Sequence, residues 1–140
     1  MKGAIAGITL GTTAPMIFRA LVEATAFGSK AIMERMKNEG IRINGCIGIG
    51  GIALKSPFVM QVMSDVLGVP ISVCKSDQAC ALGASIFAAV AAGLYPTIED
   101  AQEAMASGCA KEYKPNAENH AKYEELYKEY QKLGAYCESK

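Results

Sequence analysis

The chain has 140 residues, 51% of them apolar, and its fourteen Lys and Arg residues balance its fourteen Asp and Glu residues. This composition predicts a folded core and excludes a disordered or collagen-like chain. The net charge of zero lacks the excess of basic residues typical of nucleic-acid-binding proteins, so we expect no nucleic-acid partner. The length suits one domain, although it could supply only one wall of a cleft between two lobes.

The first elements expected along the chain are a short apolar strand over residues 3–10 and a long helix after it. Thr13 is a suitable N-cap for this helix, and Pro15 is tolerated in the first turn. Small and apolar residues then recur at helical spacing as far as residues 38–40. The small residues predict a helix that packs closely on a sheet.

Two further strands are expected at residues 46–49 and 69–74, because each is a short apolar run bounded by turn residues. A helix is expected between them. Ser56 can cap it, Pro57 suits its first position, and Gly68 ends it.

A helix rich in Ala and Gly is expected from Gln78 to about Ala92, with Asp77 as its N-cap, and a short helix follows over about 98–107. The weakly polar run around the first of these, residues 79–95, is shorter than the roughly 20 residues that a membrane span requires. We therefore expect a buried helix and no membrane partner.

The last thirty residues are rich in charge, and after Pro115 they predict a long helix. One face of this helix carries Tyr123, Leu126, Tyr127, Tyr130, Leu133 and Cys137. We expect this face to dock on the chain's own body, since Tyr can bury its ring and keep its hydroxyl wet; a recognition surface is the alternative. The expected organisation is a core over residues 1–112 and a docked helix over 113–140. The order of elements predicts an α/β fold with a mainly parallel sheet flanked by helices.

The cysteine and histidine content argues against a metal centre. The five cysteines are an odd number without C-x-x-C spacing, and most lie in apolar runs. They predict reduced structural thiols in a cytoplasmic protein, and no secretory signal precedes the first helix. His120 is the only histidine, so a His-based triad or a multi-histidine metal site is not expected.

The candidate segment for chemistry is the glycine-rich turn over residues 48–53, between a strand and a helix. Glycine allows a ligand to approach the backbone, and a helix N-terminus offers unpaired N–H groups. A purely structural turn is one alternative. A dinucleotide fingerprint, with Asp77 on a ribose, is another, but it requires the helix to begin within the glycine turn rather than at Ser56. The apolar body contains no convincing general base.

Seven segments carry a further pattern through their order and spacing. They are residues 7–15, 19–28, 50–57, 60–61, 64–68, 78–84 and 113–133. Together they resemble the C-terminal part of an FGGY-family carbohydrate kinase, most of all the ribulokinase branch of that family.

This resemblance implies the C-terminal lobe of a ribonuclease-H-like fold of the actin-like ATPase type, incomplete here because antiparallel strands of the sheet precede this segment in the family. It implies ATP as cofactor, with Gly50 and Gly51 against the adenosine and with Lys55 and Ser56 along the adenine edge. Many relatives carry Asn in place of Ser56, and Ser lacks the paired donor and acceptor of the amide.

The reaction implied for a full enzyme is transfer of the ATP γ-phosphoryl group to a ketopentose hydroxyl, with Mg²⁺ neutralising phosphate charge. In the family the base, the phosphate-gripping turn and the sugar pocket lie earlier in the sequence. We therefore expect no catalytic residue and no metal ligand in this chain, which should be inactive alone. Its uncovered sheet edge predicts self-association. A non-catalytic nucleotide-binding or regulatory module is the alternative function.

Overall fold

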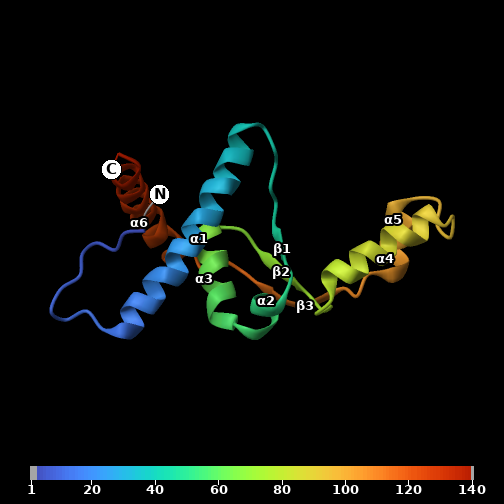
Figure 1. The fold of residues 1–140 in the computed structure, drawn as a ribbon, viewed down its shortest axis with the longest axis horizontal. Coiled ribbons are helices and arrows are strands. Elements are labelled where there is room, and N and C mark those ends of the chain that lie inside the picture. Colours follow the sequence, from blue (N-terminus) through green and yellow to red (C-terminus); the bar gives the residue numbers. More distant parts are fainter. Residues whose placement is uncertain (1–2, 140) are drawn as a thin grey trace.

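A computed structural model describes residues 3–139, so Met1, Lys2 and Lys140, which the two expected units include, lie outside the described residues. The elements in chain order are α1 (Ala14–Asn38), β1 (Cys46–Gly48), α2 (Gly51–Lys55), α3 (Pro57–Leu67), β2 (Ile71–Cys74), α4 (Ala79–Ala91), α5 (Ile98–Met105), β3 (Cys109–Tyr113) and α6 (Ala117–Glu138). Figure 1 shows an elongated molecule, with α1, α3 and α6 gathered at one end of a small sheet and α4 and α5 projecting from the other.

The sheet is mixed rather than mainly parallel. Its strand order is β1-β2-β3, with β1 and β2 parallel and β2 and β3 antiparallel. The strand expected at residues 3–10 is wrong, because this segment is exposed and has no regular structure over residues 3–9. Strand β3 was not expected, since of its five residues only Tyr113 is buried and no apolar run marks it.

Helix α1 begins and ends as expected, but it packs mainly against α3 and α6 rather than on the sheet. Pro15 lies in the first turn. Thr13 holds the extended N-cap conformation, although its side chain makes no capping hydrogen bond. Of the small residues of α1, Ala26 is buried and Ala24 and Gly28 are half-buried, whereas Ala20 and Ala31 are exposed, so only part of the expected stripe lies in a contact.

Helix α3 follows the local signals in the sequence. The Ser56 hydroxyl accepts a hydrogen bond from the Val59 N–H at 3.4 Å, and Pro57 is the first helical residue. Gly68 ends the helix in the left-handed conformation, with φ of 66°. A Cβ on Gly68 would also lie 2.5 Å from the His120 ring, so both backbone and packing require glycine there.

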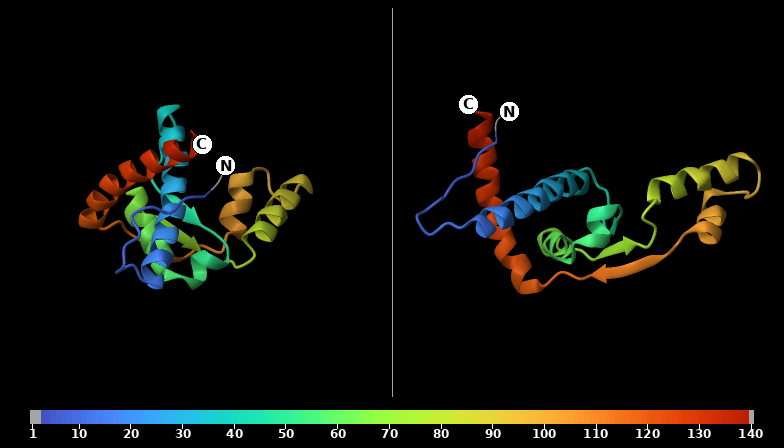
Figure 2. Two further views of the ribbon diagram at one scale, coloured as in Figure 1. Left: turned by 60° about the vertical axis from the view of Figure 1, so that its left-hand side comes forward. Right: turned by 60° about the horizontal axis from the view of Figure 1, so that its bottom comes forward.

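Helices α4 and α5 form a hairpin that leaves the body of the molecule, as all the views in Figures 1 and 2 agree. Contrary to expectation, α4 is largely exposed, and only Ile86 and Ala89 are buried along it. Asp77 is not its N-cap; Gln78 takes that position, and its N–H donates to the Ser76 hydroxyl at 3.2 Å. Within residues 3–139, no helix combines the length and hydropathy needed to cross a membrane.

Two buried clusters hold the body together. One lies between the sheet, α3 and α1, and contains Met33, Ala53, Met60, Leu67, Val69, Ile71, Val73 and Tyr113. The other joins α1, α3 and α6, and contains Ala26, Phe27, Val62, Val66, Tyr123 and Tyr127. The aromatic face of α6 thus packs on the chain's own body.

A charged pair lies beside this second cluster. Lys30 is buried, pairs with Glu124 and lies 5.1 Å from the centre of the Tyr127 ring. Because Lys30 belongs to α1 and both partners belong to α6, the pair fixes the two helices against each other.

Candidate functional site

The glycine-rich turn joins the end of β1 to the start of α2. Unexpectedly, α2 is a five-residue helix that begins at Gly51, inside the turn, and α3 begins separately at Pro57. A helix start only at Ser56 was expected, and this prediction is wrong. The short α2 went unnoticed because its five residues are too few for a helical period.

Two glycines of this turn are explained by the fold. A Cβ on Gly48 would lie 2.9 Å from the Met60 side chain, so the core requires glycine there. Gly50 has φ of 85° and ψ of 177°, a backbone region that is almost restricted to glycine. These two residues support the purely structural interpretation of the turn.

Gly51 is different, because nothing within the described chain requires it to be glycine. Its φ is not in the positive region, and a Cβ built on it meets no heavy atom within 4 Å. The residue is exposed. The open space over Gly51 is where a ligand could approach the backbone closely, as the sequence expectation requires.

Lys55 and Ser56 lie at the carboxyl end of α2. The four expected contact residues therefore lie at the two ends of one short helix. Lys55 is exposed, and among residues 3–139 no hydrogen bond or ion pair engages its side chain. Ser56 is half-buried and uses its hydroxyl oxygen to cap α3. The Ser56 hydroxyl can still donate one hydrogen bond. Lys55 is the charged residue among the four expected contact residues.

The carboxyl end of β2 lies beside this turn, a feature that the sequence alone did not reveal. Gly48 pairs with Val73 in the parallel ladder, so the chain leaves both strands at the same edge of the sheet. Cys74 and Lys75 therefore stand at the edge that carries the glycine turn. The signal that could have found them is the rule that ligands bind at the carboxyl ends of parallel strands.

The described residues contain no evident metal or acid–base centre. Over residues 3–139 no group of three or more His, Cys, Asp or Glu side chains could hold a metal ion. The buried carboxylate of Asp65 is fully engaged: it accepts from the Asn116 N–H at 2.8 Å, from the Asn119 amide at 2.9 Å and from the Gln61 amide at 2.8 Å. Asp65 thus anchors the start of α6.

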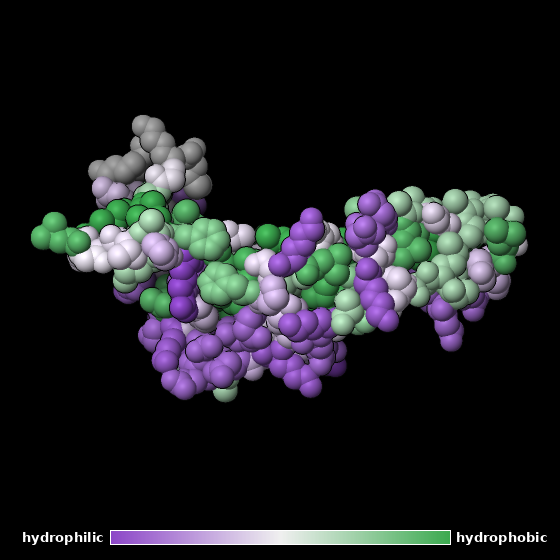
Figure 3. Space-filling view, turned by 90° about the horizontal axis from the view of Figure 1, so that it is seen from below, coloured by the Kyte–Doolittle hydropathy of each residue, from purple (hydrophilic) through white to green (hydrophobic). Residues whose placement is uncertain are grey.

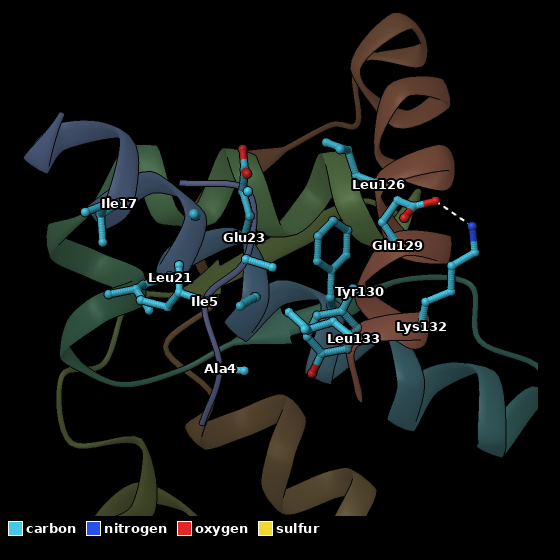
Figure 4. A pocket seen from close by; sticks show the side chains of 15 residues that line it. Ala4, Ile5, Ile17, Leu21, Glu23, Leu126, Glu129, Tyr130, Lys132 and Leu133 are labelled. Atoms are coloured by element: carbon cyan, nitrogen blue, oxygen red, sulfur yellow. Dashed lines mark hydrogen bonds and ion pairs between the residues drawn. The ribbon is translucent and has the colours of Figure 1, made fainter. Parts of the chain in front are cut away.

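A separate cavity of about 650 Å³ lies between the N-terminal segment, α1 and α6. Figure 4 shows Ile5, Leu21 and Leu133 around it, with the ion pair between Glu129 and Lys132 at 2.7 Å on α6. No residue of the glycine turn lines it. The cavity and the turn are therefore two different places on the molecule.

The comparisons with known proteins agree with the resemblance in the sequence. Residues 1–92 match the C-terminal domain of the FGGY family of carbohydrate kinases. The chain belongs to this family, which favours a kinase over a dinucleotide-dependent oxidoreductase as the interpretation of the turn.

Among curated relatives, the ribulokinase of Vibrio parahaemolyticus is 49% identical over 138 residues, covering 99% of this chain and 24% of the relative. The ribulokinase of Bacillus licheniformis is 44% identical, covering 97% of this chain and 25% of the relative. The chain thus spans about a quarter of the length of the relatives it matches.

Solved structures confirm the expected fold. A ligand-bound xylulose kinase from Lactobacillus acidophilus has a TM-score of 0.82 and 29% identity, over 95% of this chain and 26% of that one. The xylulose kinase of Rhodospirillum rubrum has a TM-score of 0.85 and 23% identity, over 99% of this chain and 28% of that one. The fold is that of sugar kinases in the ribonuclease-H-like, actin-like ATPase superfamily.

Proposed function

We propose that this chain is the nucleotide side of a kinase that phosphorylates L-ribulose with ATP, giving L-ribulose 5-phosphate and ADP. Its identity to two ribulokinases, 49% and 44%, supports this substrate. The observation that carries the nucleotide role is the open space over Gly51, at the edge where the parallel strands β1 and β2 have their carboxyl ends. We place the complete enzyme in the cytoplasm.

In this proposal Gly50 and Gly51 lie against the adenosine, and Lys55 and Ser56 follow the adenine edge. The exposed Lys55 ammonium is available to a polyphosphate or a ring acceptor, and the Ser56 hydroxyl can donate a hydrogen bond while it caps α3. Mg²⁺ would be held by the phosphates and by residues outside this chain. Residues 1–112 would form the core of the nucleotide lobe, and 113–140 its docked helix.

Calorimetric titration with ADP tests the nucleotide role. Gly51→Val should weaken binding at least about tenfold, which corresponds to about 1.4 kcal/mol. Gly134→Val on α6 is the matched control, because a Cβ there also meets no neighbour and φ is not positive. Equal affinities for the two variants would contradict the proposed site.

Catalysis should require residues that this chain does not supply. We expect the 140-residue chain to show no ATP-dependent phosphorylation of L-ribulose, because the resemblance places the base and the sugar pocket earlier in the sequence. The buried Asp65 is no substitute, since its carboxylate is committed to anchoring α6. A coupled assay for ADP release measures this, and turnover would contradict the proposal. A non-catalytic regulatory module, the alternative, would bind nucleotide and also retain a stable protein partner in a pull-down.

We also propose that the chain associates with a second copy through the free edge of β1. In the described sheet β1 pairs only with β2, and Ile47 on β1 is 75% exposed. Light scattering should give a mass above that of the monomer. Ile47→Lys should lower this mass, whereas Ile32→Lys on α1, where Ile32 is 62% exposed, should not. A monomer at high concentration would contradict the association.

A further inference from the structure

Two cysteines face each other where the α4–α5 hairpin joins the sheet. Cys74 is the last residue of β2 and Cys109 is the first residue of β3. They are direct partners in the antiparallel ladder, and both thiols are free. The intervening residues 75–108 contain the whole hairpin.

The hydrogen bonding around this pair favours a cross-strand disulfide. The Lys75 N–H donates to the Gly108 carbonyl at 3.1 Å. Lys75 and Gly108, which directly follow the two cysteines toward the hairpin, are therefore a hydrogen-bonded pair. Hydrogen-bonded and non-hydrogen-bonded pairs alternate in an antiparallel ladder, which makes Cys74 and Cys109 a non-hydrogen-bonded pair. Such pairs have Cα atoms about 4.5 Å apart and close side chains, within the range that disulfides span.

The local backbone can accommodate the link. The register shifts between Val73 and Cys74, so Ala110 is an extra residue in β3 and the strands bend there. The Cys74 thiol lies 3.6 Å from the Ser107 hydroxyl, so the Cys74 side chain points toward the segment that leads into β3. Cys109 is exposed and Cys74 is half-buried, so an oxidant can reach the pair.

We propose that Cys74 and Cys109 form a reversible disulfide when the chain meets hydrogen peroxide. Peroxide oxidises one thiol to a sulfenic acid and leaves as water. The second thiol then attacks that sulfur; the S–S bond forms, the S–O bond breaks, and a second water leaves. Two thiols and one peroxide thus give one disulfide and two waters, and a dithiol reductant reverses the change.

The consequence is a clamp at the base of the hairpin. Without it, α4 and α5 pack on each other and are joined to the body through β2 and β3. With it, residues 75–108 become a covalently closed loop, whose ends can no longer separate. Because Cys74 stands at the sheet edge that carries the glycine turn, the clamp would fix the hairpin relative to that turn.

Peptide mapping after oxidation tests this modification site. The folded chain is treated with peroxide, its remaining thiols are alkylated, and it is digested with trypsin without reduction. Cys80→Ser is used as the background, because the tryptic peptide 76–111 contains both Cys80 and Cys109. We expect peptides 56–75 and 76–111 to be joined, with the loss of two hydrogen masses, and to separate on reduction.

Matched variants decide the assignment. In the Cys80→Ser background, a further Cys74→Ser or Cys109→Ser change should each abolish the link, and Cys137→Ser should leave it intact. Oxidation in denaturant should give mixed pairs, which checks that the fold selects the partners. Alkylation of both Cys74 and Cys109 after peroxide treatment, or links of either cysteine to another partner in the folded chain, would overturn the proposal.

Discussion

The two ends of this molecule differ in how far their large apolar side chains are buried. At one end, Phe27 of α1 meets Tyr123, Tyr127 and Tyr130 of α6, with ring centres 5.4–6.0 Å apart. At the other end, the α4–α5 hairpin leaves Phe87 and Leu94 exposed by 62% and 72%. Figure 3 shows apolar side chains over much of the visible face of this projecting end. One end therefore carries an aromatic cluster buried between two helices, whereas the hairpin buries only Ile86, Ala89 and Ala101 along its two helices.

The largest difference between the two ends should come from their phenylalanines. Phe27→Ala removes a ring that is 6% exposed and should lower the free energy of unfolding by about 4 kcal/mol. Phe87→Ala, on the hairpin, should change it by less than about 0.5 kcal/mol. Urea unfolding of the two variants measures both values, and similar losses would show that the hairpin is packed as tightly as the body.

Two helix-ending glycines give the next comparison. Gly68 and Gly93 both have positive φ, of 66° and 73°, but only a Cβ on Gly68 would strike another side chain, that of His120. Gly68→Ala should therefore cost about 3 kcal/mol, from backbone strain together with displacement of the ring. Gly93→Ala should cost about 1 kcal/mol, for backbone strain alone. Thermal unfolding measures the loss of stability in both variants. Equal losses would contradict a steric contribution from the His120 ring.

The alkaline side of the pH range should weaken the body selectively. Burial, followed by the hydrogen bond to Glu34 at 3.0 Å, raises the pKa of Tyr127 to about 12, and burial also raises the pKa of Tyr123. Because the raised pKa belongs to the folded state, the full stabilisation is present below about pH 10 and is lost as the pH rises through about 12.

Urea unfolding at about pH 9 and about pH 11.5 measures this loss. Tyr127→Phe has no hydroxyl to ionise, so its stability should fall less between the two pH values. An equal fall in the variant and the unchanged chain would contradict the assignment of the loss to Tyr127.

Local signals predicted the elements whose ends are set by their own residues. Ser56, Pro57 and Gly68 correctly mark the ends of α3, and α1 ends near residues 38–40 as expected. The predictions failed where contacts between residues far apart in the sequence determine the structure. Strand β3 exists because it pairs with β2, and α4 is exposed because little of the chain reaches it, although its Ala-rich sequence is typical of a buried helix.

The family resemblance in the sequence predicts four contact residues for the candidate site: Gly50, Gly51, Lys55 and Ser56. The sequence cannot distinguish a glycine needed for packing from one that leaves room for a ligand. Only the neighbours supplied by folding separate Gly48, which would strike Met60, from Gly51, which meets nothing. Whether these four residues contact a nucleotide stays a prediction.

Amide chemical-shift mapping with ADP tests the central claim most directly. If the chain is the nucleotide side of a sugar kinase, saturating ADP should shift the amides of Gly50, Gly51, Lys55 and Ser56 more than those of α6. Shifts confined to the cavity between α1 and α6, or no shifts at millimolar ADP, would contradict the account.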